Sequence, residues 1–255
     1  MVKVTVIIPT YNEIENIDSI LKAVRSSVPD AELLVVDDNS PDGTGQQADK
    51  TAAEIGRVRV LHRPGKEGLG TAYRDAFKLV LSGDTDVIIT MDADFSHDPQ
   101  TIPLFLDAIK NGAEIVVGSR YIKDGMSVNW PLHRLLLSKW GNRYTAFMLK
   151  IEVHDCTTGF RAYTAQSMRS IEILKTISQG YAFASETLFR ASMRGEKNIV
   201  EIPIIFHDRK YGKSKMNGRS SFKSKFQGSP LGLAVLKSIA LSPLRLRFRR
   251  DRFAP

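Results

Sequence analysis

The stretch Val87-Ile-Ile-Thr-Met-Asp-Ala-Asp94 is an apolar run that ends in two acidic side chains. An unbroken apolar run of this kind is typical of a strand that is buried on both faces of a parallel sheet. The same pattern occurs at Val2–Pro9, and again at Leu33–Val36, which leads into Asp37 and Asp38. Ligands of parallel sheets bind beyond the carboxyl ends of the strands, so these acidic groups are candidate ligand-binding residues.

Segments with helical periodicity separate the strands in the first half of the chain. After the first strand, Asn12 and Glu15 form a capping-box-like helix start, because the two are three residues apart. The remaining predicted elements are helices over Gly43–Ile55, over Gly70–Leu81 and from Asp98-Pro99 onward, and strands over Val58–Leu61 and Ile115–Gly118. This alternation predicts an α/β fold with a mostly parallel, Rossmann-like sheet and helices on both faces.

The second half of the chain is less regular. Its predicted elements are a helix over Trp130–Lys150, a loop or short strand over Asp155–Tyr163, a short helix over Ser185–Met193, a strand over Ile199–Phe206 and a basic loop over His207–Gly218. We expect one catalytic domain over residues 1–218 and a basic, amphipathic tail over residues 219–255.

The positive charge is confined to the C-terminal part of the chain. The 255 residues carry a formal net charge of +8, but residues 207–255 contain 13 Lys and Arg against 2 Asp and Glu, a net of +11. Residues 1–206 hold the other 23 basic and 26 acidic side chains, a net of −3. A mildly acidic body is typical of an enzyme and not of a nucleic-acid binder, so we expect no nucleic-acid partner.

Composition and motif spacing exclude several classes of protein. Cys156 is the single cysteine, which excludes a disulfide scaffold and a multi-cysteine zinc site. No apolar run reaches the roughly 18 residues of a spanning helix, and the strand-like N-terminus does not resemble a signal peptide. Gly65–Gly70 lacks dinucleotide-loop spacing, and Gly212-Lys-Ser214 lacks the first glycine of a P-loop because His207 stands there. We expect a chain that faces the cytoplasm, with a reduced thiol.

Asp92 and Asp94 suit a hard divalent cation that bridges to a diphosphate, because both are carboxylates and they lie one residue apart. The same pattern is also typical of solvated loop carboxylates. Asp38 suits hydrogen bonds from a ribose or a base edge, whereas the run from Asp37 to Gly43 is rich in turn-forming residues. These two interpretations are compatible, with Asp38 binding a ligand and its neighbours forming the turn.

Four motifs, in order and spacing, resemble glycosyltransferase family 2, whose members have the GT-A fold. These motifs are Ile8-Pro-Thr-Tyr-Asn-Glu13, Val35-Val-Asp-Asp38, Met91-Asp-Ala-Asp94 and Gly118-Ser-Arg120. Further motifs resemble the dolichyl- or polyprenyl-phosphate mannosyltransferases of that family, namely Asn129-Trp-Pro131, Asp155 with Gly159-Phe-Arg161, and Arg209-Lys-Tyr-Gly-Lys-Ser-Lys-Met216. The resemblance covers residues 1 to about 218.

The resemblance implies a nucleotide-sugar site. The residues implied to hold the guanosine of GDP-mannose are Pro9, Tyr11, Glu13, Val36 and Asp38. Asp92 and Asp94 are implied to hold Mg²⁺ or Mn²⁺ and the diphosphate, with Ala93 between them in the same nucleotide-sugar site. Ser96 stands where some relatives have a longer glutamine that reaches the metal, so either Ser96 or a water is the expected ligand there.

Basic residues are implied to offset the phosphate charges. They are Arg120 and Arg134 at the lipid phosphate, with Arg120 also at the nucleotide sugar, and Arg209 and Lys215 over the diphosphate. Asp155 and Glu186 lie where a catalytic base is expected in relatives that act on hydroxyl groups. A phosphate monoester, with a second pKa of about 6, is largely ionised at neutral pH and needs no base. We therefore expect these two acids to orient the arginines or the sugar, or to form ion pairs that hold a loop.

The implied activity is the inverting transfer of mannose from GDP-mannose to dolichyl or polyprenyl phosphate. The alternatives are a UDP-glucose-dependent polyprenyl-phosphate glucosyltransferase and, in another class, a non-catalytic membrane-binding or nucleic-acid-binding module. The apolar and basic side chains of residues 130–150 suit a helix in a membrane interface, or equally a core-packing helix with a charged outer face. We expect peripheral association with the cytoplasmic face of a membrane, with a separate membrane-anchoring protein as a further candidate partner.

Overall fold

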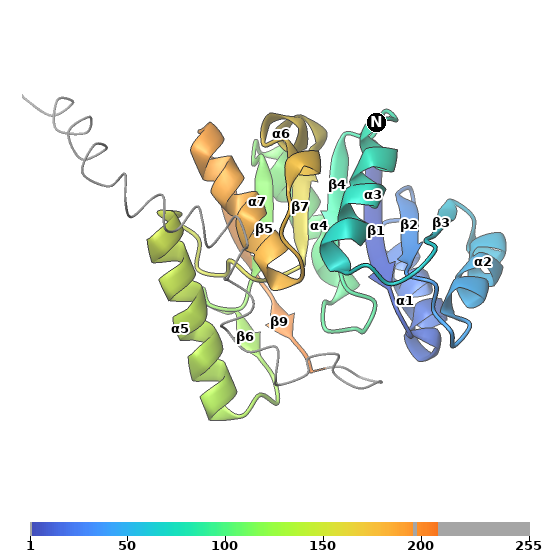
Figure 1. The fold of residues 1–255 in the computed structure, drawn as a ribbon, viewed down its shortest axis with the longest axis horizontal. Helices are drawn as coiled ribbons and strands as arrows, with labels where there is room; N and C mark the ends of the chain where they lie inside the picture. Colours follow the sequence, from blue (N-terminus) through green and yellow to red (C-terminus); the bar gives the residue numbers. More distant parts are fainter. Residues whose placement is uncertain (1, 196–197, 209–255) are drawn as a thin grey trace, which may run out of the picture. The chain divides into compact units, whose positions relative to one another are not determined.

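A seven-stranded sheet, in the order β3-β2-β1-β4-β7-β5-β8, positions the candidate site (Figure 1). The computed structural model describes residues 2–195 and 198–208. The strands are β1 (Val4–Thr10), β2 (Glu32–Asp37), β3 (Val58–His62), β4 (Val87–Thr90), β5 (Ile115–Ser119), β7 (Arg161–Thr164) and β8 (Ile199–Pro203). Neighbouring strands are parallel except at β7, which runs antiparallel to β4 and β5. The mostly parallel sheet predicted from the sequence is confirmed.

Helices cover both faces of this sheet. They are α1 (Ile14–Ser27), α2 (Thr44–Ile55), α3 (Leu69–Leu81), α4 (Ile102–Lys110), α5 (Leu132–Leu149), α6 (Ala165–Ser170) and α7 (Tyr181–Arg194), with 3-10 turns at Pro99–Thr101 and Ile173–Lys175. In Figure 1, α3 and α7 lie in front of the sheet, with α1 and α4 behind it. Val6 and Ile8 of β1 pack in one buried cluster with Ile17 of α1 and Phe105 of α4. Each central strand is therefore apolar on both faces, as its unbroken apolar run predicts.

A second, two-stranded sheet of β6 (Met126–Ser127) and β9 (Ile205–Phe206) corrects one prediction. The expected single strand over Ile199–Phe206 is wrong, because β8 and β9 belong to different sheets. Ile204 lies between them, donates its N–H to the Ser119 carbonyl at 3.0 Å and accepts the Met126 N–H at 3.0 Å. This pairing sets Phe206 beside the segment that leads into α5.

The capping box expected at Asn12 and Glu15 is also wrong. Asn12 has a φ of +56°, which is not the extended backbone of an N-cap residue, and Glu13 takes the N-cap position without a side-chain cap bond. The backbone N–H groups of Asn12 and Glu13 instead donate to Ser40 Oγ at 3.0 Å and Thr44 Oγ1 at 2.9 Å. Side chains of the β2–α2 loop and of the first residue of α2 thus accept the backbone N–H groups that precede α1.

The remaining differences concern the ends of helices and one short helix, α6, that the sequence did not predict. Helix α5 lies within the predicted range, and α7 begins at Tyr181 and not at Ser185. The expected domain boundary at residue 218 and the tail over residues 219–255 lie outside the described residues. Among the helices that the structure describes, none has the length and hydropathy needed to cross a membrane.

Candidate active site

The carboxyl ends of β1 and β2 place the residues expected to bind the nucleotide. Pro9 pairs in register with Val36, so these two residues lie side by side at one edge of the sheet. Asp37 accepts hydrogen bonds from Thr10 Oγ1 at 3.0 Å and from the Ser40 N–H at 3.0 Å, and is buried. Asp37 therefore holds the turn and leaves the next residue, Asp38, as the ligand-binding candidate.

Asp38 forms a buried ion pair with Arg63, a residue that sequence reasoning missed. Arg63 Nε also contacts Asp75 Oδ2 at 2.9 Å, and its NH2 contacts Glu67 Oε2 at 3.2 Å. Burial opposes the charge of Arg63, but its bonds to Asp38 and Asp75 outweigh that effect and raise its pKa. The position of Arg63 in the sequence could have indicated its place at the site, because Arg63 follows β3 just as Asp38 follows β2.

Tyr11 and Glu13 lie beside this pair at the end of β1. The Lys66 ammonium lies 3.8 Å from the centroid of the Tyr11 ring, a cation–π contact between the β1 end and the loop after β3. The Glu13 carboxylate is buried and accepts a hydrogen bond from Asn16 Nδ2 at 3.0 Å. Glu13 therefore stabilises the first turn of α1, and its role in binding the nucleotide stays a prediction.

The acidic motif Asp92-Ala-Asp94 follows β4 and is folded into a tight turn. Phe95 has a φ of +59°, and the Ser96 N–H donates to Asp94 Oδ1 at 3.1 Å. The Asp92 N–H donates to His97 Nδ1 at 3.1 Å. Two carboxylates and the Ser96 hydroxyl are thus gathered at one strand end.

The residues of this turn fit a divalent cation that shares its ligands with a substrate. Ser96 Oγ is buried without a hydrogen-bond partner in the described structure, which leaves an oxygen lone pair for a ligand. No set of three His, Cys, Asp or Glu side chains that could hold a metal occurs within residues 2–195 and 198–208. Mg²⁺ is commonly held by one or two carboxylates together with waters and substrate phosphates, so Asp92 and Asp94 form a sufficient protein contribution.

His97 was not singled out from the sequence. Its side chain nevertheless accepts a hydrogen bond from the backbone of the acidic motif. Because the Asp92 amide donates to Nδ1, the imidazole proton is on Nε2 and the ring is neutral. Burial is the main cause that lowers the His97 pKa, in opposition to the nearby Asp92 and Asp94. The ring stacks on Phe160 at 5.0 Å between centroids and meets Phe206 edge-on at 5.7 Å.

Arg120 and Asp155 form a second buried ion pair, with the Arg120 guanidinium carbon 5.2 Å from the Phe206 ring centroid. Arg120 Nε lies 2.6 Å from Asp155 Oδ2, and Arg120 NH2 lies 2.8 Å from Oδ1, a bidentate arrangement. Burial alone would raise the Asp155 pKa, but the charge and hydrogen bonds of Arg120 outweigh it and hold that pKa below its ordinary value. Asp155 therefore fixes the orientation of Arg120, and its lowered pKa makes it a weak base.

Of the other expected phosphate-binding and orienting residues, Arg134 lies near Arg120, because both contact the Trp130 ring, whereas Glu186 has other partners. Arg134, on α5, lies 3.9 Å from the Trp130 ring centroid and 3.5 Å from Asp208 Oδ2. Glu186 accepts hydrogen bonds from the Ser178 N–H at 2.8 Å and Arg190 Nε at 3.0 Å, so it holds a loop and does not orient the arginines. Arg209 and Lys215 lie outside the described residues.

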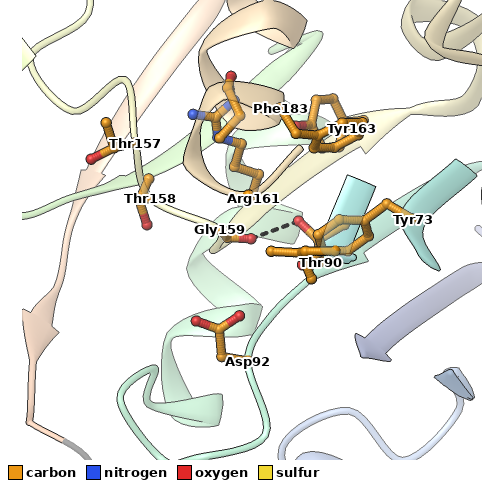
Figure 2. A pocket seen from close by; sticks show the side chains of 12 residues that line it. Tyr73, Thr90, Asp92, Thr157, Thr158, Gly159, Arg161, Tyr163 and Phe183 are labelled. Atoms are coloured by element: carbon orange, nitrogen blue, oxygen red, sulfur yellow. Dashed lines mark hydrogen bonds between the residues drawn. The ribbon is translucent and has the colours of Figure 1, made fainter. Parts of the chain in front are cut away.

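A pocket opens between the acidic motif and the front helices (Figure 2). Asp92, Gly159 and Tyr73 line it, and Thr90 Oγ1 donates to the Gly159 carbonyl at 2.7 Å. A Cβ at Gly159 would lie 3.5 Å from Asp92 Oδ1, so the glycine keeps the space in front of that carboxylate open. The pocket therefore lies directly beside the candidate cation site.

Solved structures of proteins that bind nucleotide sugars share this fold. Glucosyl-3-phosphoglycerate synthase from Mycobacterium tuberculosis, crystallised with Mn²⁺ and UDP-glucose, matches with a TM-score of 0.65 at 18% identity, over 90% of this chain and 78% of that chain. S. aureus TarS in complex with UDP-GlcNAc matches with a TM-score of 0.58 at 16% identity, over 84% and 61%. The fold is that of the GT-A glycosyltransferases.

The chain belongs to glycosyl transferase family 2, whose model matches residues 5–171. It is 46% identical over 216 residues to an undecaprenyl-phosphate mannosyltransferase of Micrococcus luteus, covering 85% of this chain and 88% of the relative. It is 43% identical over 229 residues to a polyprenol monophosphomannose synthase of Mycolicibacterium smegmatis, covering 89% and 86%. A dolichol-phosphate mannosyltransferase of Pyrococcus furiosus is 36% identical over 225 residues, covering 87% and 61%.

Proposed function

We propose that this chain transfers mannose from GDP-mannose to polyprenyl or dolichyl phosphate with inversion at the anomeric carbon. One observation carries the proposal: the acidic turn, through His97, and the Arg120–Asp155 ion pair both lie next to a single ring, Phe206. His97, which bonds the acidic turn, lies 5.7 Å from the Phe206 centroid, and the Arg120 guanidinium carbon lies 5.2 Å from it. Sites for two phosphate-bearing substrates are thereby adjacent.

The donor side is formed by the strand ends of β1, β2 and β4. Asp38, held by Arg63, offers carboxylate oxygens to the base or ribose, and Asp92 and Asp94 face the diphosphate. Mg²⁺ or Mn²⁺ bound there supplies positive charge for the departing diphosphate. We expect the sugar on the side of Asp92 that Gly159 leaves open.

The acceptor side is formed by Arg120 and Arg134. A phosphate oxygen of the lipid attacks C1 of mannose on the face opposite the departing GDP, so a C1–O bond forms as the C1–O bond to the diphosphate breaks. The attacking phosphate carries its own negative charge, and no proton has to be removed. Arg120 offsets that charge in a fixed orientation because Asp155 holds its guanidinium from behind.

The lipid reaches the site along α5. This helix exposes large apolar side chains with exposed fractions of 74% at Leu137, 70% at Trp140 and 77% at Phe147. Arg134 lies on the same helix, so a phosphate engaged there belongs to a lipid whose chain follows these side chains. We infer peripheral membrane binding through α5 and the basic tail, with GDP-mannose, lipid phosphate, a membrane surface and a membrane-anchoring protein as partners.

The test is a transfer assay with radiolabelled GDP-mannose, polyprenyl phosphate and Mg²⁺ or Mn²⁺, followed by lipid extraction. We expect label in the lipid phase, and at least roughly 100-fold less with Asp94→Ala or with EDTA. Asp107→Ala, which removes an exposed carboxylate on α4, is the matched control. Transfer from UDP-glucose in place of GDP-mannose, or activity that survives EDTA, would contradict the proposal.

A further inference from the structure

The Trp130 ring lies close to both acceptor-side arginines, Arg120 and Arg134. The guanidinium carbon of Arg134 is 3.9 Å from the Trp130 ring centroid, and that of Arg120 is 5.6 Å from it. Both distances fall within the roughly 6 Å range of cation–π attraction, which is strongest for tryptophan. One ring therefore attracts both cations that the proposed reaction needs.

The charges around the pair explain why such a ring is needed. Arg120 has a buried carboxylate in Asp155 at 2.6 Å, whereas Arg134 pairs, among the residues that the structure describes, with the half-exposed Asp208 at 3.5 Å. An exposed ion pair of that length orders a side chain weakly. The repulsion between two guanidinium groups near one phosphate site would turn Arg134 outward, and the electron-rich ring face opposes this.

The ring is itself held in place. Phe206 meets the Trp130 ring edge-on, with centroids 5.5 Å apart and an interplanar angle of 77°. The Val128 N–H donates to the Phe206 carbonyl at 2.8 Å, which fixes the backbone of the two segments together. Trp130 Nε1 is buried without a hydrogen-bond partner in the described part of the chain, so the ring makes these contacts and the N–H does not.

We propose that Trp130 is a positioning residue for the acceptor phosphate, holding Arg120 and Arg134 over one aromatic ring so that both address the same phosphate. The proposal rests on the proposed function and adds to it a residue that touches neither the donor nor the reacting atoms. It predicts that the strength of the ring's cation attraction, and not its volume alone, sets the affinity for the lipid acceptor.

The first experiment compares Trp130→Leu and Trp130→Phe in the full chain. We expect Trp130→Leu to raise the KM for polyprenyl phosphate roughly 5- to 30-fold, and Trp130→Phe to recover part of that loss because a weaker aromatic face remains. The KM for GDP-mannose should stay within about twofold, since the described ring contacts of Trp130 are with Phe206, Arg120 and Arg134 and do not include Asp38, Asp92 or Asp94. Equal acceptor KM values in all three proteins, or a matching rise in both KM values, would overturn the proposal.

The second experiment keeps the shape of the side chain. Mono-, di- and trifluorinated tryptophans placed at position 130 alone weaken the ring's attraction for cations stepwise while the packing stays nearly constant. We expect the logarithm of the acceptor KM to rise with each added fluorine, whereas a purely structural role predicts no trend. Vesicles with and without polyprenyl phosphate provide a readout independent of turnover, with the phosphate-dependent part of binding falling along the same series. Absence of transfer in the parent chain would overturn the proposed function, and this vesicle comparison would still decide the role of Trp130.

Discussion

At the residue scale, the buried carboxylate of Asp38 is stabilised by an ion pair with Arg63. Asp38 is 6% exposed and Arg63 is 5% exposed, so neither charge has much contact with water. A buried ion that loses its partner costs several kcal/mol, whereas an exposed pair contributes little. Arg63 thus holds the carboxylate of Asp38, the residue proposed to bind the nucleotide.

Arg63→Met should lower the free energy of unfolding by about 3–5 kcal/mol, because Asp38 remains buried without its counter-ion. Arg57→Met is the control, since its pair with Asp30 is exposed and its loss should cost about 1 kcal/mol or less. Urea unfolding of both variants measures the difference. Equal costs would show that the Asp38–Arg63 pair contributes no more than a surface pair.

His97 makes the stability of the fold depend on pH. Burial lowers its pKa from 6.5, so the unfolded chain takes up a proton that the folded chain does not between the two values. The free energy of unfolding should therefore fall as pH drops below about 6.5, by up to about 1.4 kcal/mol per pH unit.

The His97→Gln variant should flatten that dependence, because glutamine does not titrate and its carbonyl can still accept the Asp92 N–H. Urea midpoints at about pH 5.5 and about pH 7.5 give the comparison. His62, which is exposed and bonds Asp49, provides the control variant His62→Gln. A slope that changes in the His62 variant and not in the His97 variant would refute the assignment.

At the scale of elements, α5 is a surface helix whose apolar side chains are not covered by the rest of the described chain. Leu137 and Phe147 are 74% and 77% exposed, although helices of a globular core bury such residues. The alternative of a core-packing helix, left open by the sequence, therefore does not describe α5. The observation favours an interface with lipid.

Leu137→Glu and Phe147→Glu should each weaken binding to lipid vesicles roughly 10- to 150-fold, because each removes about 1.5–3 kcal/mol of apolar burial. Leu104→Glu is the matched control, since Leu104 is 53% exposed but lies on α4. Vesicle flotation of the full chain measures the binding. A loss of the same size in the Leu104 variant would argue against α5 as the lipid-binding surface.

At the scale of the whole molecule, charge divides the chain into a mildly acidic body and a basic C-terminal segment. The net charges are −3 over residues 1–206 and +11 over residues 207–255. A surface rich in anionic lipid attracts such a segment with about 1 kcal/mol per basic side chain near it. The acidic body gives no corresponding reason to bind nucleic acid.

Replacing the five arginines of the tail by glutamine in the full chain should reduce binding to anionic vesicles and leave binding to neutral vesicles nearly unchanged. These arginines are Arg245, Arg247, Arg249, Arg250 and Arg252. The loss should shrink as salt is added, because the Debye length falls from about 10 Å at 0.1 M to about 3 Å at 1 M. Flotation at two salt concentrations tests this. An unchanged affinity for anionic vesicles would assign membrane binding to α5 alone.

The sheet and the acidic turn were predictable because their signals are local. An apolar run such as Val87–Thr90 is read within one strand, and the polar residues after it follow directly in the chain. The capping box at Asn12 failed because its donors are satisfied by a loop some thirty residues away, at Ser40 and Thr44. The break that divides the predicted strand over Ile199–Phe206 into β8 and β9 was missed for the same reason, since the partner of β9, β6, is distant in sequence.

The sequence by itself determined the fold class, the positions of Asp38, Asp92 and Asp94, and the division of charge along the chain. Only the tertiary structure decided which side chains share their environment: Arg63 with Asp38, His97 with Asp92, and Trp130 between two arginines. The spacing of apolar residues along a chain indicates which residues are buried and whether they belong to a helix or a strand, because burial follows the period of the element. Partners across the sheet are set by packing between distant segments, and no local period encodes them.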